Sequence, residues 1–213
     1  MKRDFSTVTL PEIFIVRACE TVGEREGRQL GYLDSPISAK GIEQAQVAGR
    51  ALRGILGDQR SVYIETSPLG RAGHTTALLC VELGLDPSAM SVAPQLVDCG
   101  LGAWQGLTNA QIDERFPGER QARERDKWSY VIPGGESYAD VSQRVQQWLA
   151  RPRRAQVTIA VTHRMVSRIL QGCYAGMGPE DTLRLSHQQG RIYRLREGRV
   201  EEIPCDATRS RAN

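Results

Sequence analysis

The chain has 213 residues, of which 40% are hydrophobic and 25% charged, the composition of an ordinary globular protein rather than a disordered or fibrous one. No apolar stretch approaches the ~18 residues of a membrane-spanning helix. The formal net charge is +3, from 28 basic and 25 acidic side chains, so bulk charge favours no nucleic-acid partner. The N-terminal residues lack the apolar stretch of a signal peptide, and we expect a cytoplasmic protein that does not bind a membrane.

Apolar runs rich in β-branched residues alternate with segments of helical periodicity along the chain. The run at 156–162 is nearly continuous, which is typical of a central parallel strand buried on both faces. Ser38 and Ser137 are expected N-caps of two helices. The predicted strands are 12–17, 61–66, 90–97 and 156–162, followed by a hairpin of 192–195 and 200–203; the predicted helices are 38–57, 69–83, 109–116, 137–150 and one that begins after His163.

This alternation predicts a three-layer α/β/α sandwich with a mostly parallel central sheet. We expect one domain over 1–213, with the polar region at about 104–138 forming a small inserted cap and the last eight residues frayed. Ligands of such sheets bind beyond the carboxyl ends of the strands. At those ends the sequence has Arg17, the turn 67–71, Asp98 and His163, which are therefore the candidate site residues.

Several common signatures are absent from the sequence, including the phosphate-binding and dinucleotide-binding glycine loops and the zinc-protease motif. The chain has only three histidines, so a multi-histidine metal site would use all of them. The five cysteines form no C-x-x-C pair and are expected to be free thiols in a reducing compartment. We therefore expect no metal and no cofactor.

The segment 16–21 (VRACET) resembles the Arg-His-Gly-Glu-Thr motif of the histidine phosphatase superfamily, the phosphoglycerate mutase-like enzymes. Other segments resemble further motifs of that family, in the same order, between about residues 12 and 195. The resemblance implies the family's α/β fold, with phosphatase activity as a closer analogy than mutase activity. The matching segments are 31–45, 67–72 (SPLGRA), 96–106, 133–137 (PGGES) and 161–163 (VTH).

In that family a histidine attacks phosphorus and becomes a phosphohistidine, and an acidic residue protonates the leaving oxygen. Two arginines and a second histidine hold the phosphoryl oxygens, because forked guanidinium groups match phosphate geometry. Carried over residue by residue, the resemblance implies that Arg17 and Arg71 clamp phosphate and that His163 is the second histidine. Asp98 stands at the position of the proton donor. The sequence is equally compatible with Asp98 as a helix cap or a loop carboxylate.

The sequence departs from the family pattern at the nucleophile, whose position is occupied by Ala18. A methyl group cannot attack phosphorus, so ordinary phosphohistidine catalysis is not expected. Further departures are Cys19 for the following glycine, Glu24 for an asparagine, Gln105 for an acidic residue and Arg164 for a glycine. Several changes in one pocket favour natural divergence over a single engineered inactivation.

Two of these departures carry charge, and we hypothesise that Glu24 and Arg164 compensate each other or contact a different substrate. Cys19 has two interpretations. It could replace the nucleophile, if two arginines lower its pKa, or it could be a small residue that fills the place of the glycine. His74 and His187 receive no functional role.

Three functions remain open from the sequence. The first is a divergent enzyme that acts on a small phosphorylated or carboxylated molecule through acid–base chemistry of Asp98 and His163. The second is a catalytically dead pseudophosphatase that binds such a ligand, and the third is a phosphomonoester phosphatase inactivated at its nucleophile. In each case the expected partner is a small anion, and a homodimer is compatible with the sequence.

Overall fold

The computed structural model describes residues 11–57, 61–152 and 154–205. The frayed end predicted for the last eight residues lies outside these ranges. Six strands form one sheet in the order β3-β2-β4-β1-β5-β6. The first four strands are mutually parallel, β5 pairs antiparallel with β1, and β6 pairs antiparallel with β5. The strands are β1 (Glu12–Arg17), β2 (Val62–Thr66), β3 (Ser91–Val92), β4 (Val157–Thr162), β5 (Arg191–Arg196) and β6 (Arg199–Pro204). This arrangement confirms the predicted α/β fold with a mostly parallel sheet.

The predicted long helices are present, and the side chains of Ser38 and Ser137 cap two of them. The short helices α1, α5 and α8 were not predicted. The α-helices are α1 (Val22–Arg25), α2 (Ala39–Leu56), α3 (Gly70–Leu83), α4 (Asn109–Arg115), α5 (Glu119–Arg125), α6 (Tyr138–Leu149), α7 (Arg164–Tyr174) and α8 (Pro179–Arg184), and the 3₁₀ segments are η1 (Pro87–Ala89), η2 (Pro94–Leu96) and η3 (Gly102–Trp104).

The strand predicted over 90–97 is wrong in extent. Only Ser91–Val92 pair with β2, and the chain then turns into the 3₁₀ segment η2. Pro94 opens that segment, and proline has no N–H to donate to a strand ladder. This early end of the strand leaves the following residues free to form the loop that carries Asp98.

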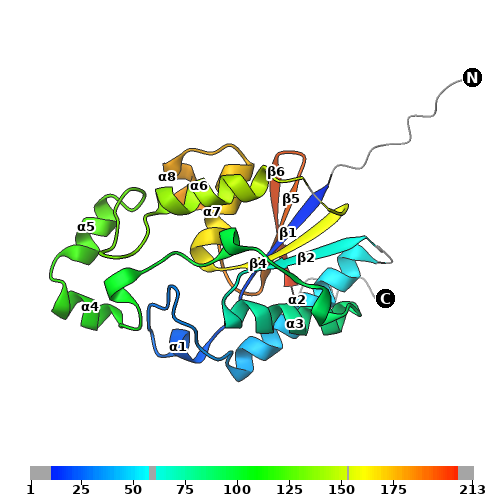
Figure 1. Ribbon diagram of the computed structural model, residues 1–213, viewed down its shortest axis with the longest axis horizontal. Helices are drawn as coiled ribbons and strands as arrows, with labels where there is room; N and C mark the ends of the chain where they lie inside the picture. Colours follow the sequence, from blue (N-terminus) through cyan, green and yellow to red (C-terminus); the bar gives the residue numbers. More distant parts are fainter. Residues whose placement is uncertain (1–10, 58–60, 153, 206–213) are drawn as a thin grey trace, which may run out of the picture.

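Side chains of β1 alternate between the two faces of the sheet. Phe14 and Val16 pack in one core with residues of α2 and α3, whereas Ile13 and Ile15 pack in a second core with residues of α6 and α7. Figure 1 shows these two helix pairs on opposite sides of the sheet, so the architecture has three layers. The central strand β4 is buried at every position, which explains its continuous apolar run.

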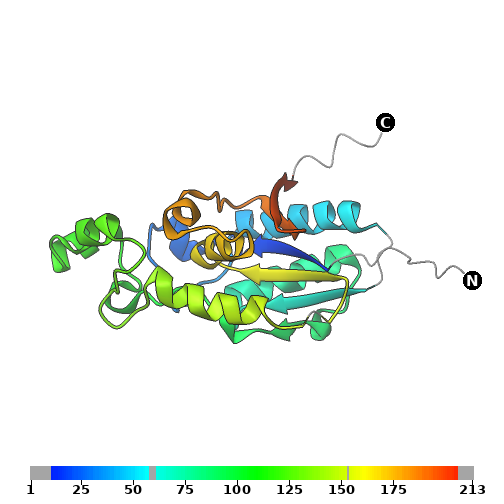
Figure 2. The ribbon, with the colours of Figure 1, turned by 90° about the horizontal axis from the view of Figure 1, so that it is seen from above.

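The parallel strands β1, β2 and β4 end at the same side of the sheet. In Figure 2 their arrowheads point toward the end of the molecule at which α4 and α5 lie. The region at about 104–138, which contains these two helices, therefore lies beyond the carboxyl ends of the strands. Its description as an inserted cap within one domain stays a prediction.

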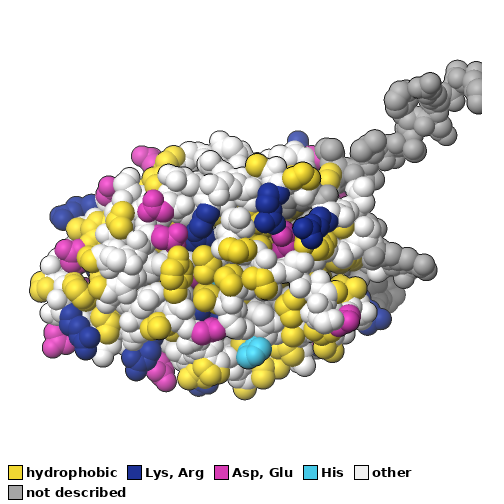
Figure 3. Space-filling model, viewed as in Figure 1, with side chains coloured by type: hydrophobic (Ala, Val, Ile, Leu, Met, Phe, Trp, Pro, Cys, Tyr) yellow, Lys and Arg dark blue, Asp and Glu magenta, His cyan; other side chains and the backbone are white. Residues whose placement is uncertain are grey.

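Charged side chains of both signs are interspersed on the surface drawn in Figure 3. This face shows no large field of one sign, in agreement with the small net charge. Across the ranges that the structure describes, no helix combines the length and the apolar character that crossing a bilayer would need.

Gly41 lets the first turn of α2 approach the loop that follows β1. A Cβ at this residue would lie 2.2 Å from the backbone oxygen of Glu20 and 2.5 Å from a methyl of Ile37. We predict that Gly41→Ala lowers the free energy of unfolding by about 1–3 kcal/mol, because the backbone has to shift. The matched control is Gly73→Ala within α3, where a Cβ meets no atom within 4 Å.

Urea unfolding of both variants measures this difference. Gly73→Ala should stabilise the protein by up to about 1 kcal/mol, because alanine is the better helix former. Equal stability of Gly41→Ala and the unmodified protein would show that the close approach of α2 to the loop is not required.

Candidate anion-binding site

All seven predicted site residues line one cavity of about 410 Å³ at the carboxyl ends of the strands; they are Arg17, Cys19, Glu24, Arg71, Asp98, His163 and Arg164. Arg17 is the last residue of β1, Arg71 lies in the first turn of α3, and Asp98 follows η2. His163 connects β4 to α7. These residues are distant in sequence and are brought together by the parallel arrangement of the strands. We call the space between these four side chains the arginine pocket.

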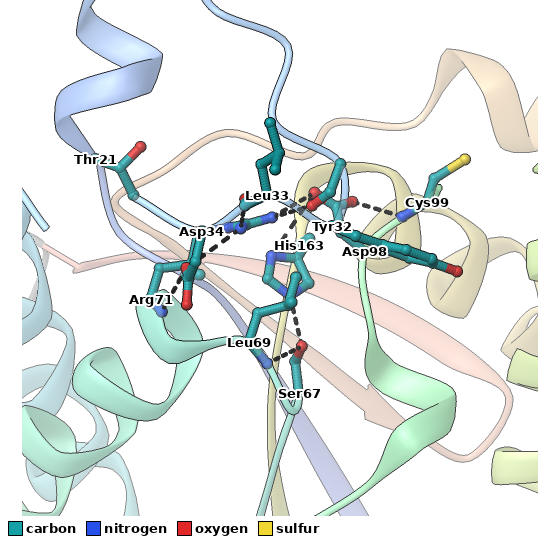
Figure 4. A network of polar contacts seen from close by, with 12 residues as sticks. Thr21, Tyr32, Leu33, Asp34, Ser67, Leu69, Arg71, Asp98, Cys99 and His163 are labelled. Carbon is teal, nitrogen blue, oxygen red and sulfur yellow. Dashed lines mark hydrogen bonds and ion pairs between the residues drawn. The ribbon is translucent and has the colours of Figure 1, made fainter. Parts of the chain in front are cut away.

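Arg71 is almost entirely buried, with 4% of its side chain exposed. Its guanidinium donates to the carbonyl oxygens of Gly31 and Leu33, each at 2.7 Å, and to Asp98 Oδ2 at 3.0 Å. Asp34 accepts from the backbone N–H of Arg71 at 3.1 Å and holds the start of α3. Figure 4 shows Leu33, Asp34 and Asp98 around Arg71. Arg71 therefore fixes the loop 31–34 and Asp98 relative to α3.

The ring of His163 is held between Ser67 and Asp98. Its Nε2 lies 2.7 Å from Ser67 Oγ, and its Nδ1 lies 3.8 Å from Asp98 Oδ2 (Figure 4). Burial places the pKa of His163 well below its ordinary value, and the positive charges of Arg71 and Arg17 lower it further. The imidazole is therefore neutral at physiological pH and can exchange a proton.

Asp98 is the carboxyl group nearest to His163. Burial raises its pKa, an effect opposed by the positive charge of Arg71 and by the hydrogen bond from the backbone N–H of Cys99 at 2.8 Å. A carboxyl group with a raised pKa retains its proton to a higher pH than usual. Asp98 can consequently donate a proton to an oxygen atom in the pocket.

Arg17 is paired with a carboxylate rather than free. Its guanidinium lies 2.6 Å from Glu24 Oε1 and 3.4 Å from the carbonyl oxygen of His187. Burial lowers the pKa of Arg17, and the charge of Glu24 opposes that effect. Glu24 also completes the capping box of α1 with Thr21, and Gln189 donates to its other oxygen at 3.4 Å. The position of Glu24 is therefore fixed by three neighbouring residues, Arg17, Thr21 and Gln189.

Arg164, the first residue of α7, is exposed and lines the same cavity as Glu24. The ion-pair partner of Glu24 is Arg17, and Arg164 forms no ion pair with any residue that the structure describes. The hypothesis that Glu24 and Arg164 compensate each other stays a prediction.

Cys19 is buried, and its backbone N–H donates to Thr75 Oγ1 at 3.1 Å. The interpretation of Cys19 as a replacement nucleophile requires its thiol to have a lowered pKa. Burial raises this pKa to about 12, and the opposing effect of Arg17 is smaller. A thiol with such a pKa contains very little thiolate at neutral pH, which disfavours Cys19 as a nucleophile. The neighbouring Ala18 lines the cavity with a methyl group.

The segment PGGES (133–137) contributes Glu136 to a hydrogen-bond network that contacts the Asp98 loop. Glu136 accepts from Arg144 at 3.0 Å, from the hydroxyl of Tyr32 at 3.0 Å and from the backbone N–H of Gly100 at 2.8 Å. Arg144 in turn donates to the carbonyl oxygen of Asp98 at 2.9 Å. This network holds the Asp98 loop against α6.

Sequence reasoning missed the loop between α8 and β5, which contributes His187 and Gln189 to the site. Arg168 Nη2 lies 2.7 Å from His187 Nδ1, and Gln189 lines the arginine pocket. The loop matches no family motif, so nothing in the sequence pointed to it. His74 is exposed on α3, and the absence of a functional role for it stays a prediction.

No group of three or more histidine, cysteine, aspartate or glutamate side chains in the described ranges could hold a metal ion. The groups that face the arginine pocket are instead guanidinium, imidazole and carboxyl. Guanidinium groups and a neutral imidazole are suited to a phosphoryl or carboxylate group. The fold and these residues together define an α/β protein with a candidate anion-binding site at the carboxyl edge of its sheet.

The chain belongs to the histidine phosphatase superfamily (branch 1), whose family model matches residues 13–201. It is 28% identical over 182 residues to the adenosylcobalamin/α-ribazole phosphatase of Escherichia coli, which covers 84% of this chain and 86% of that protein. It is 37% identical over 123 residues to the glucosyl-3-phosphoglycerate phosphatase of Mycobacterium tuberculosis. That match covers 58% of this chain and about half of the relative, 52%.

Solved structures of two such phosphatases resemble the fold. The α-ribazole phosphatase of Shigella flexneri has a TM-score of 0.77 at 25% identity, over 91% of this chain and 95% of that chain. The mycobacterial glucosyl-3-phosphoglycerate phosphatase has a TM-score of 0.72 at 26% identity, over 86% and 89% of the two chains. The relatives named here are phosphatases of small phosphorylated molecules.

His187 makes the stability of the protein depend on pH. Burial and the charge of Arg168 lower its pKa to about 4 in the folded protein. The unfolded chain takes up this proton near pH 6.5 and the folded protein does not, so stability falls as the pH falls from about 6.5 to 4. Between pH 7 and pH 5 the free energy of unfolding falls, and we predict that His187→Gln makes this fall smaller by about 1 kcal/mol. This value is discounted for solvent screening, because the ring is only half-buried.

Urea unfolding at the two pH values provides the measurement, with exposed His74→Gln as the matched control. The control should keep the pH dependence of the unmodified protein. Identical losses in the unmodified protein and in His187→Gln would contradict a neutral His187.

Proposed function

We propose that the protein binds a small phosphorylated or carboxylated molecule in the arginine pocket, and that any turnover of a phosphomonoester occurs without a phosphohistidine. One observation carries this proposal. The pocket has the buried guanidinium group of Arg71, the partly buried one of Arg17, a neutral imidazole and a carboxyl group with a raised pKa, but its wall at the end of β1 is the methyl group of Ala18.

The resemblance to the family motif puts Ala18 at the position of the nucleophile. Its backbone N–H donates to the carbonyl oxygen of Thr162 at 2.6 Å, so the residue is anchored at the carboxyl edge of the sheet, beside Arg17. Cys19, the next residue, is disfavoured as a replacement by the raised pKa of its thiol. Loss of a nucleophile costs on the order of a million-fold in rate in enzymes where it has been measured. Turnover is therefore expected to be slow.

A slow hydrolysis can be written with the groups that remain. Water adds to phosphorus while the ester P–O bond breaks, and the leaving oxygen takes the proton of Asp98. His163 accepts the proton of the attacking water at Nδ1, which requires the tautomer in which Nε2–H donates to Ser67. The products are an alcohol and inorganic phosphate. A proton then returns from His163 Nδ1 to Asp98 Oδ2, which lies 3.8 Å away.

Binding without turnover is the second candidate, and the ion pair of Arg17 with Glu24 favours it. In this pair Glu24 Oε1 lies 2.6 Å from Arg17 Nη2, on one of the two guanidinium groups expected to hold phosphate. A phosphoryl group has to compete with Glu24 for the guanidinium, and the negative charges repel each other. A ligand-binding pseudophosphatase tolerates this arrangement better than an efficient enzyme does.

We predict that Ala18→His combined with Cys19→Gly raises the rate of phosphate release from phosphomonoesters by several orders of magnitude. The imidazole supplies the missing nucleophile, and glycine removes the buried thiol while retaining the backbone N–H that bonds Thr75. Phosphate release from a panel of phosphomonoesters, measured for both proteins, provides the test.

Cys19→Gly alone is the matched control and should stay as slow as the unmodified protein. Rapid turnover by the unmodified protein would show that its catalysis needs no histidine at residue 18. If neither protein releases phosphate and neither binds inorganic phosphate, a phosphate ligand is removed from the proposal.

A further inference from the structure

A cavity of about 340 Å³ lies near the amino ends of β2 and β4, whereas the arginine pocket lies beyond their carboxyl ends. We call it the amino-end cavity. Its volume is within the range of small-molecule sites, about 300–1,000 Å³. None of its six lining residues lines the arginine pocket; they are Tyr63 and Glu65 of β2, Thr158 of β4, and Arg151, Pro152 and Arg154 of the segment between α6 and β4.

The strands place three of these side chains on one face of the sheet. Tyr63 pairs with Thr158 in the parallel register of β2 and β4, and Glu65 lies two residues beyond Tyr63. Because side chains alternate between the faces of a strand, all three point to the same side. Ile13, the partner of Thr158 on β1, packs in the core with α6 and α7. The amino-end cavity therefore lies on the face that these two helices cover.

Thr158 carries a hydroxyl group that the fold does not use. The residue is 1% exposed, and its Oγ1 is buried without a hydrogen-bond partner in the described part of the chain. By contrast, the hydroxyl of Thr162 on the same strand donates to the carbonyl oxygen of Leu96 at 2.8 Å. Valine is β-branched in the same way and would fill this position without burying a polar group. A hydrogen-bonding ligand in the cavity would supply the partner that Thr158 lacks.

The guanidinium group of Arg154 is the uncompensated charge of the amino-end cavity. Its Nη1 donates to the hydroxyl of Tyr63 at 3.0 Å, and its Cζ lies 5.3 Å from the centre of the Tyr63 ring. A cation–π contact leaves the charge of the guanidinium in place. Arg151, in contrast, forms an ion pair with the buried carboxylate of Glu65. Two guanidinium groups and one carboxylate leave one positive charge for a ligand.

Tyr63 sets the distance between the two groups that lack a full complement of partners. Thr158 lies beside the backbone of Tyr63, because the two residues are register partners. Arg154 contacts the hydroxyl at the far end of the Tyr63 side chain. A molecule that reaches both Thr158 and Arg154 is therefore about as long as a tyrosine side chain. The rings of Tyr63 and Pro152 add apolar surface to the walls of the cavity.

We infer that the amino-end cavity binds a small aromatic carboxylate with a hydroxyl group at the opposite end of its ring. The carboxylate pairs with Arg154, the hydroxyl forms a hydrogen bond with Thr158, and the ring lies along Tyr63. A monoanion matches the single uncompensated guanidinium group, whereas the second charge of a phosphate dianion would be repelled by Glu65. The inference does not depend on the proposed function, because the two sites share no residue.

Calorimetric titration with three matched probes tests the site. In para-hydroxybenzoate the carboxylate and the hydroxyl lie at opposite ends of the ring, in ortho-hydroxybenzoate they lie at the same end, and benzoate has no hydroxyl. We expect para-hydroxybenzoate to bind about fivefold or more tighter than the other two probes, which corresponds to about 1 kcal/mol for the additional hydrogen bond.

Two variants assign the two contacts. Thr158→Val should abolish the preference for para-hydroxybenzoate over benzoate and leave the affinity for benzoate within about twofold. It should be at least as stable to urea as the unmodified protein, because it removes a buried hydroxyl without a partner. Arg154→Gln should weaken the binding of all three probes by about fivefold or more. The matched control is the exposed Arg50→Gln on α2, which packs against the opposite face of the sheet and should leave each affinity within about twofold.

A further variant, Arg17→Gln, separates the two sites, because the proposed ligands of the arginine pocket include carboxylates. It should leave the affinity for para-hydroxybenzoate within about twofold. The inference would be overturned by failure of para-hydroxybenzoate to bind, by equal binding of para-hydroxybenzoate and benzoate to the unmodified protein, or by a loss in Arg17→Gln that Arg154→Gln does not show. None of these results contradicts the proposed function, which titration of inorganic phosphate tests separately.

Discussion

The buried guanidinium group of Arg71 holds the site together. It connects α3 to the loop 31–34 and to the Asp98 loop through hydrogen bonds of 2.7–3.0 Å. A buried cation without partners would be strongly destabilising, so these acceptors are a condition of its burial. Its charge also acts on its neighbours. It opposes the rise in the pKa of Asp98 and contributes to the low pKa of His163. These two pKa values determine which of the two groups carries a proton.

The charge balance of the arginine pocket also affects how a ligand can bind there. The two guanidinium groups that we propose to bind a phosphoryl group already have acidic partners, Arg17 with Glu24 and Arg71 with Asp34. A ligand would have to displace or tolerate these acidic side chains. Together with the methyl group of Ala18, this pairing favours the proposal of a site that recognises its ligand more than it transfers a phosphoryl group rapidly.

The sequence predicted the fold well, because the β-branched run of β4 and the serine caps of α2 and α6 are local signals. It also predicted that Arg17, Arg71, Asp98 and His163 lie at strand ends, since parallel strands end at one edge. It could not predict that Glu24 pairs with Arg17, because that contact depends on the exact turn of α1. Nor could it predict the contact between His187 and Arg168, since their loop and helix carry no motif. The burial of Cys19, which raises the pKa of its thiol, is likewise a tertiary property.

The central claim is that the arginine pocket binds an anion in competition with its own carboxylate. Calorimetric titration of inorganic phosphate into the protein and into Glu24→Gln tests it, and glutamine can preserve the capping box of α1. The account predicts binding to both proteins, tighter by about fivefold or more in Glu24→Gln, because removal of a carboxylate beside the phosphate relieves on the order of 1 kcal/mol of repulsion. Absence of binding to either protein, or weaker binding to Glu24→Gln, would contradict it.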